Sequence, residues 1–446
     1  MAPSNVKRAR FEAKNDLVAE EKKTPLTITD LPTELIDMIF NEMDIPSIKS
    51  TDPVPISIRP STLTCWTIRN VAVNYLTFTH CYINGTDDLD HFLRFLRHCD
   101  RARRTVRMLR LDNAVLDATR VNDIKQVFPN LVDIMLKDIT CDPPSIHANA
   151  NGQPGQPAAP PLAPPRRLDQ LHIMCTRATS GWSLSGMMHT LSLLRVEPQV
   201  LYVSTEHCGY SEDAFDPRCV VGLSAVPNLV VCFHDPESST PIAGLLDALS
   251  HTLDPNVLQS VEVQYDSKET LRALGAMLER VGRNVIKLTI KPHAPSTFQQ
   301  RQAWVDPFDD WRLLDIRPCQ KLVYLSLHIY VRRKKNVSKA LSLPGAGLIA
   351  NYAPPATFRK VVIHLHDLPR ATTLGNRSVL KLQEFDKVLT QDRFPHVRQL
   401  YLDVGITEDL YDTPDYREEC RAAARRALPR LGARGLLEVL VQRWFE

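Results

Sequence analysis

The stretch that decides the fold is LQSVEVQYDSKETLRALGAMLERVGRNVIKLTI, residues 258–290. A short apolar pattern, with apolar residues at positions 1, 4 and 6, occurs in it twice, as Leu258-Val261-Val263 and as Val285-Leu288-Ile290. Between the two copies, residues 268–282 have the apolar spacing of an amphipathic helix. The stretch therefore predicts a strand, a helix and a second strand, with the two copies of the pattern starting 27 residues apart.

The same pattern occurs eight times along the chain, which predicts an array of similar units. The copies are Val106-Leu109-Leu111, Leu131-Ile134-Leu136, Leu168-Leu171-Ile173, Leu258-Val261-Val263, Val285-Leu288-Ile290, Leu322-Leu325-Leu327, Phe358-Val361-Ile363 and Val397-Leu400-Leu402, with a degenerate copy at 226–229. Helical patterns lie at 87–99, 241–253, 268–282, 382–394 and 416–428. We predict an α/β fold in which short parallel strands and helices alternate and stack side by side.

Composition limits the function classes that fit the chain. Of 446 residues, 43% are hydrophobic and 24% charged, and the net charge is only +3, so nucleic acid is not the default partner. The ten cysteines form no C-x-x-C pair. No secretory signal or 18-residue apolar run is present, which predicts a cytoplasmic or nuclear location without membrane contact. Motifs of nucleophilic, phosphate-binding or metal-dependent catalysis are missing, so we expect no enzyme activity and no cofactor.

Changes in composition predict the domain boundaries. Residues 1–24 are polar and predict a disordered tail, in which the basic cluster at 7–10 is either a nuclear import signal or simply solvated. Residues 141–167 contain eight prolines and predict a second disordered segment. We assign 25–83 to a helical module with a proline-rich insert at 45–61, 84–140 to the first repeats, and 168–446 to the remaining repeats.

The sharpest local motif is TITDLPTELIDMIFNEMD, residues 27–44. Thr29 or Asp30 is suited to cap a helix, and Pro32 suits its first turn, where no amide hydrogen is needed. The helix that follows is apolar on more than half of its circumference. A helix this short is marginal alone, and its second apolar stripe predicts a protein partner.

These residues resemble the F-box, the helix by which a large protein family docks on the Skp adaptor of cullin-based SCF ubiquitin ligases. The resemblance implies that the adaptor is bound by Leu31, Pro32, Leu35, Ile39 and Phe40. A second F-box helix is matched only loosely at Leu63-Thr64-Cys65. An N-terminal F-box followed by irregular leucine-rich repeats is an arrangement similar to that of F-box proteins of basidiomycete fungi. Position nine of those repeats usually carries Asn or Cys, whereas here it carries other residues, such as Ala114 and Ile139.

The resemblance implies a substrate-recognition subunit whose repeats bind a target protein. Strand positions 3, 5 and 7 face away from the core, and there we expect substrate binding by Lys287, Lys291, Tyr324, His328, Lys360, His364 and Tyr401. His364 and His366 have the spacing of some metal ligands, but without further ligands nearby we expect no metal. The alternative is a free-standing repeat scaffold, possibly nuclear, that contacts nucleic acid through residues 332–335. Neither hypothesis implies a homo-oligomer.

Overall fold

The structure is a computed structural model, and all of the residues it describes belong to one compact unit, 78–446. The described residues are 79–140, 166–174, 184–204, 225–232, 242–265, 268–292, 314–331, 349, 354–366, 368, 370–376, 380, 382–392, 394–406 and 413–443. Leu31, Pro32, Leu35, Ile39 and Phe40 therefore lie outside the described residues. So do the basic runs at 7–10 and 332–335, and nearly all of the segment 141–167.

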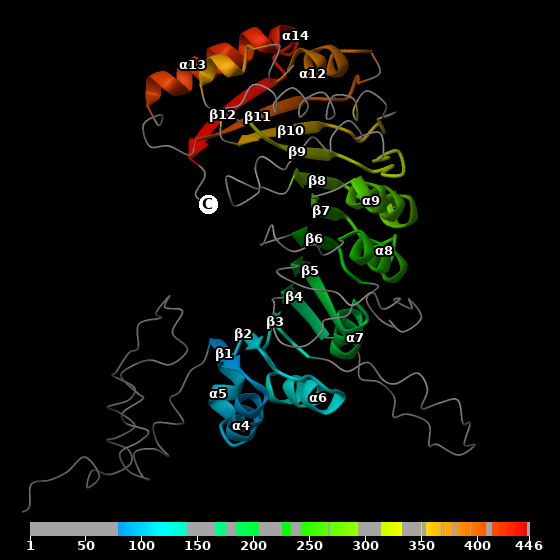
Figure 1. Ribbon diagram of the computed structural model, residues 1–446, viewed down its shortest axis with the longest axis vertical. Coiled ribbons are helices and arrows are strands. Elements are labelled where there is room, and N and C mark those ends of the chain that lie inside the picture. The colour runs from blue at the N-terminus through cyan, green and yellow to red at the C-terminus, as the bar shows by residue number, and fades with distance from the viewer. Residues whose placement is uncertain are drawn as a thin grey trace, which may run out of the picture. The chain divides into compact units, whose positions relative to one another are not determined.

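Twelve strands form one sheet in which every described pair is parallel and the strands follow one another in sequence order (Figure 1). The strands are β1 His80–Asn84, β2 Met108–Asp112, β3 Asp133–Lys137, β4 Arg166–Met174, β5 Val196–Ser204, β6 Asn228–Cys232, β7 Ser260–Tyr265, β8 Lys287–Pro292, β9 Tyr324–Tyr330, β10 Lys360–His366, β11 Gln399–Ile406 and β12 Leu437–Arg443. The predicted α/β class with short parallel strands is confirmed.

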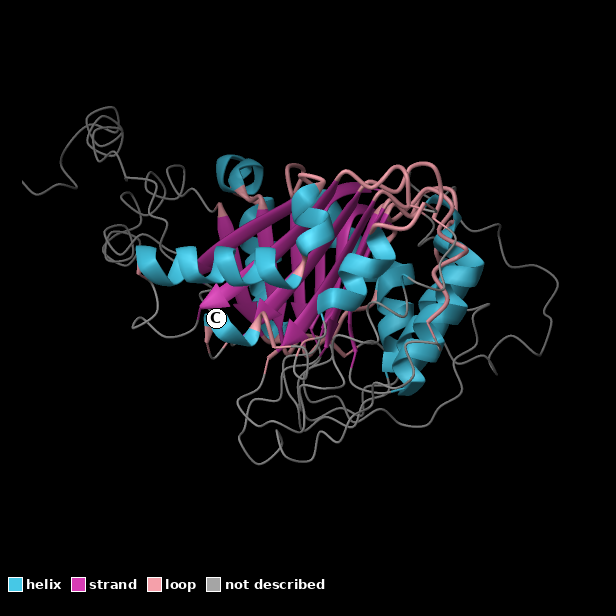
Figure 2. Ribbon diagram, turned by 90° about the horizontal axis from the view of Figure 1, so that it is seen from above, coloured by secondary structure: helices cyan, strands magenta, loops and turns pink. Residues whose placement is uncertain are grey.

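Helices and 3₁₀ turns connect many of the strands. They are α4 Thr86–Arg97, α5 Asp100–Thr105, α6 Ala118–Val127, α7 Leu184–Leu194, α8 Ile242–Thr252, α9 Lys268–Val281, η4 Gly282–Asn284, η6 Ala371–Thr373, α12 Leu382–Leu389, α13 Pro414–Ala427 and α14 Pro429–Ala433. Figure 1 shows α7, α8 and α9 following one another beside β4–β8, and Figure 2 shows the strands running in a common direction. The helices predicted at 87–99, 241–253, 268–282, 382–394 and 416–428 are confirmed as α4, α8, α9, α12 and α13.

The repeated apolar pattern forms the core. All residues at positions 1, 4 and 6 of the eight predicted copies are buried, none more than 6% exposed. Each strand therefore places one set of side chains in the core, where burial stabilises the fold by about 25 cal/mol per Å² of apolar area. The alternate residues lie on the opposite face of the sheet, which we call the accessible face.

Two predicted boundaries are a few residues too late. Strand β1 lies in the sheet although its residues 80–83 were assigned to the helical module, and β4 begins at Arg166, inside the range 141–167. In β1 only Cys81 and Ile83 are buried, and β4 begins with two arginines, so neither strand start fills the three-position pattern. The apolar pattern also did not predict strands β5 and β12. In β5, Pro198 interrupts the pattern. Strand β12 is the last strand of the described sheet and has little buried surface.

Asparagine side chains join neighbouring units at the turns before β3 and β8 and at the first residue of β6. The side-chain amides of Asn130, Asn228 and Asn284 donate to the carbonyl oxygens of Arg104, Gln199 and Pro255, at 2.7, 2.8 and 3.0 Å. Each bond ties a turn to the unit before it, and each asparagine precedes an apolar pattern residue. These bonds lie at the opposite end of the strand from position nine, where the resemblance placed such a ladder.

Among the helices described, none is both long and apolar enough to span a bilayer.

Candidate functional site

The predicted substrate-binding residues lie together on the accessible face of four adjacent strands, β8 to β11. The strand register places Lys287 beside Tyr324 and Tyr324 beside Lys360, and it pairs His328 with His364. Tyr401 pairs with Val362 in the row between these two. Because the strands are parallel and in register, residues far apart in sequence form two rows across the strands.

The first row is a ladder of lysines and tyrosines. The Lys287 and Lys360 ammonium groups lie 5.5 and 5.4 Å from the centroid of the Tyr324 ring, and Lys360 also lies 3.8 Å from the centroid of Tyr401. These are cation–π distances. Neither lysine has a carboxylate partner among the described residues. Two positive charges are therefore held over aromatic rings and remain available to a negatively charged group.

The two tyrosines that contact these lysines stay protonated at neutral pH. Burial raises the pKa of Tyr324, and a hydrogen bond with Glu438 is the main cause that raises the pKa of Tyr401. Both phenols therefore offer neutral hydrogen-bonding groups next to the lysines.

The second row is a cluster of three histidines. The His328 ring stacks on His364 with centroids 4.1 Å apart and on His366 at 5.2 Å. His328 Nδ1 and His366 Nε2 are 2.9 Å apart, so one of these nitrogens donates to the other. His364 Nδ1 lies 2.9 Å from a carboxylate oxygen of Asp403, and the Gln442 amide donates to that same oxygen at 2.9 Å.

The surroundings of His328 and His366 favour their neutral imidazoles. Burial is the main cause that lowers the pKa of His328, and the neighbouring His364, His366 and Lys291 lower it further. Burial likewise lowers the pKa of His366 to about 4, with Asp403 acting in the opposite direction. His328 is only 7% exposed, so a partner would meet the other two histidines more readily.

The protein is expected to lose stability as pH falls from about 6.5 toward 4. When the pH is below the unfolded-state pKa of roughly 6.5, His328 and His366 bind protons in the unfolded chain but remain neutral in the folded protein. Stability therefore decreases by roughly 1.4 kcal/mol per pH unit for each such histidine. Thermal unfolding between pH 7.5 and 4.5 measures this slope, and His366→Gln should make it shallower. An unchanged slope in that variant would contradict the assignment.

The predicted set of substrate-binding residues leaves out four residues of this site. Asp403 and Gln442 position His364, His366 extends the cluster, and Glu262 forms an ion pair with Lys291. Lys291 therefore contributes less free charge than expected, because the diagonal contact from β7 to β8 neutralises it. Asp403 follows the strand pattern at position 7, so its place on this face was predictable, whereas its partner was not.

The site gives no sign of metal ligation or of a catalytic arrangement beyond the His364–Asp403 pair. In the part of the chain that the structure describes, no group of three or more His, Cys, Asp and Glu residues is placed to hold a metal ion. The second oxygen of Asp403 is buried and accepts no hydrogen bond from any described residue. The described residues of the site are two lysines without a carboxylate partner, two phenols and three stacked histidines.

Neither the family models nor the curated proteins compared with this chain give a match. The inference of function accordingly rests on the residues themselves.

Proposed function

We propose that this protein is a non-catalytic substrate-recognition subunit of an SCF-type E3 ubiquitin ligase. In this proposal residues 25–83 contain an F-box that docks on the Skp adaptor. The strand-and-helix units form an irregular leucine-rich-repeat-like solenoid that binds a target protein. The proposal places the protein in the cytoplasm or the nucleus, where such ligases act.

The observation that carries the proposal is the motif LPTELIDMIF at residues 31–40. Its apolar residues occupy more of the helix circumference than one small module can cover. Leu31 and Pro32 would lie at the adaptor surface, with Leu35, Ile39 and Phe40 in the joint core. Burying several such side chains is worth on the order of 1.5–3 kcal/mol each.

The accessible face of β8 to β11 supports the second half of the proposal. Lys287 and Lys360 lack carboxylate partners among the described residues, and tyrosines lie beside both. Lysines next to aromatic residues on one face of a sheet suit a protein segment with some negative charge. The chain would then supply proximity, because holding a target near the ubiquitin-carrying partners raises its local concentration.

Co-purification with the Skp adaptor tests the proposal. Replacing Leu31 and Pro32 with alanine is expected to weaken adaptor binding at least thirtyfold, because buried contacts worth about 2–4 kcal/mol are lost. The matched control is Lys287→Glu with Lys360→Glu, which should leave adaptor binding intact while releasing co-purified targets that mass spectrometry identifies. Full adaptor binding by the Leu31 and Pro32 variant would refute the proposal.

A further inference from the structure

The turn before β11 lacks a side-chain bond that the turns before β3 and β10 have, where Asn130 and Thr357 each donate to a carbonyl oxygen of the preceding unit. The phrases Phe128-Pro129-Asn130 and Phe394-Pro395-His396 occupy equivalent places before β3 and β11. Asn130 donates to the unit before it, but His396 makes no side-chain hydrogen bond with any described residue. Where the first turn is tied to its neighbour, the second is therefore left open.

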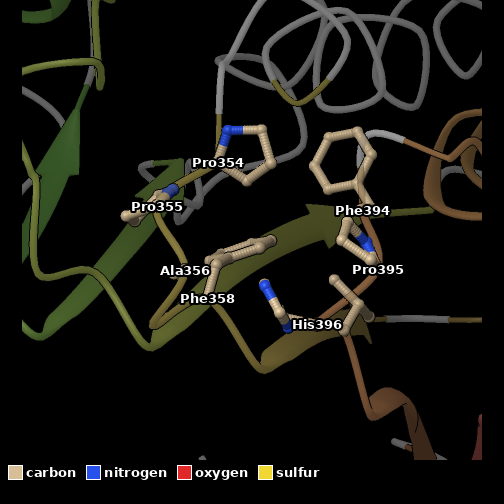
Figure 3. A pocket seen from close by; sticks show the side chains of 8 residues that line it. Pro354, Pro355, Ala356, Phe358, Phe394, Pro395 and His396 are labelled. Atoms are coloured by element: carbon tan, nitrogen blue, oxygen red, sulfur yellow. The ribbon is translucent and has the colours of Figure 1, made fainter.

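A pocket lies at this opening (Figure 3). Its volume is about 190 Å³, and its walls include Pro354, Pro355, Phe358, Phe394, Pro395 and His396. The two phenylalanines are 1% and 3% exposed and form the buried wall, with ring centroids 6.3 Å apart. Pro395 and His396 are exposed, so the pocket is reached from solvent. An apolar cavity of ~150 Å³ holds benzene, so this one has room for a single leucine or phenylalanine side chain.

Three cations are close in sequence to residues that line the pocket. Arg359 and Lys360 follow Phe358, and Arg398 follows Val397, whereas the nearest described carboxylate in sequence is Asp392, two residues before Phe394. The Arg359 guanidinium donates to the carbonyl oxygens of Ala356, which lines the pocket, and of Phe358. None of the three cations has a carboxylate partner within the described residues. A half-open pocket walled by two phenylalanines, with the Arg359 guanidinium at its edge, complements an apolar side chain flanked by acids.

We propose that this pocket docks an extended peptide segment through one apolar side chain whose sequence neighbours are acidic. The apolar side chain enters between the turns, and the flanking carboxylates meet Arg359, Lys360 and Arg398. The peptide site goes beyond the proposed function because its pocket lies in the turns before the strands. Lys360 is the only residue of this site that also belongs to the predicted substrate-binding residues.

Fluorescence anisotropy with the purified full chain tests the proposal, using three labelled pentapeptides. One has leucine flanked by two glutamates on each side, the second has glycine in place of leucine, and the third has lysines in place of the glutamates. The leucine–glutamate peptide is expected to bind at least about tenfold more tightly than either of the others. Its affinity should fall as salt is raised, because the flanking contacts are exposed.

Two variants and one control variant locate the binding. Arg398→Glu should weaken the leucine–glutamate peptide several-fold, whereas Arg107→Glu, an exposed arginine at the same pattern position before β2, should not. His396→Asn should also weaken it, because the asparagine amide can bridge to the preceding turn as Asn130 does and narrow the pocket. Circular dichroism checks that both variants keep the parent fold.

Equal binding of the leucine and glycine peptides, or tighter binding of the lysine peptide, would overturn the proposal. So would equal effects of Arg398→Glu and Arg107→Glu. The titration needs no adaptor, and the chain with Leu31 and Pro32 replaced by alanine should bind the peptide like the parent. Failure here is therefore distinguishable from failure of the ligase proposal.

Discussion

Replacing Leu288 with alanine is expected to lower the free energy of unfolding by about 2–5 kcal/mol. Leu288 is fully buried in β8, and the strands on both sides pair with it through Val261 and Leu325. Neighbouring side chains are fixed by the parallel register and can close only part of the cavity that the substitution leaves. Urea unfolding followed by circular dichroism measures the change.

Ile286→Ala is the matched control for this prediction. Ile286 is also a large aliphatic residue and lies two positions before Leu288, but it is 40% exposed. Truncating it should therefore lower the free energy of unfolding by less than about 1 kcal/mol. Similar destabilisation by the two substitutions would contradict the assignment of pattern positions 1, 4 and 6 to the core. Because units of such an array contact mainly their neighbours, a broadened transition is also expected for Leu288→Ala.

Replacing Asp386 with alanine is expected to cost about 2–3 kcal/mol and to loosen the C-terminal end of the sheet. The Asp386 carboxylate, 4% exposed, accepts the backbone N–H groups of Leu431 and Arg430 at 2.8 and 3.2 Å. It thus caps the start of α14 from α12, more than 40 residues away in sequence. Without it, two N–H groups lose their partner and the favourable charge at the helix N-terminus is lost.

Hydrogen exchange over residues 429–443 checks this prediction, because α14 leads directly into β12. Faster exchange in that segment should accompany Asp386→Ala but not Lys387→Ala, an exposed residue on the same helix. The effect should extend to the histidine cluster, since Gln442 of β12 donates to the Asp403 carboxylate that also holds His364. Unchanged exchange in α14 and β12 would show that the cap is unimportant.

The repeated strands were predictable because their pattern is local. Burial on one face alone requires apolar residues at positions 1, 4 and 6, and eight segments satisfy that requirement in the sequence. Strands β5 and β12 were not predictable in this way. Pro198 stands within β5, and the described sheet ends at β12, which needs few buried side chains.

The grouping of the candidate site followed from the same alternation, since residues at positions 3, 5 and 7 of adjacent parallel strands share a face. The contacts within it did not follow. Lys291 contacts Glu262, and Asp403 contacts both His364 and Gln442. These contacts depend on the distances between side chains on neighbouring strands, and a single sequence does not specify those distances. The pocket at His396 depends on a missing bond between two turns, which only the packed units reveal.

The measurement that tests the central claim most directly is a calorimetric titration of the purified chain with purified Skp adaptor. The account predicts a one-to-one complex whose formation is lost when Leu31 and Pro32 are both replaced by alanine. It also predicts that Lys287→Glu with Lys360→Glu leaves the affinity unchanged. Absence of binding by the unmodified chain, or equal binding by the Leu31 and Pro32 variant, would contradict it.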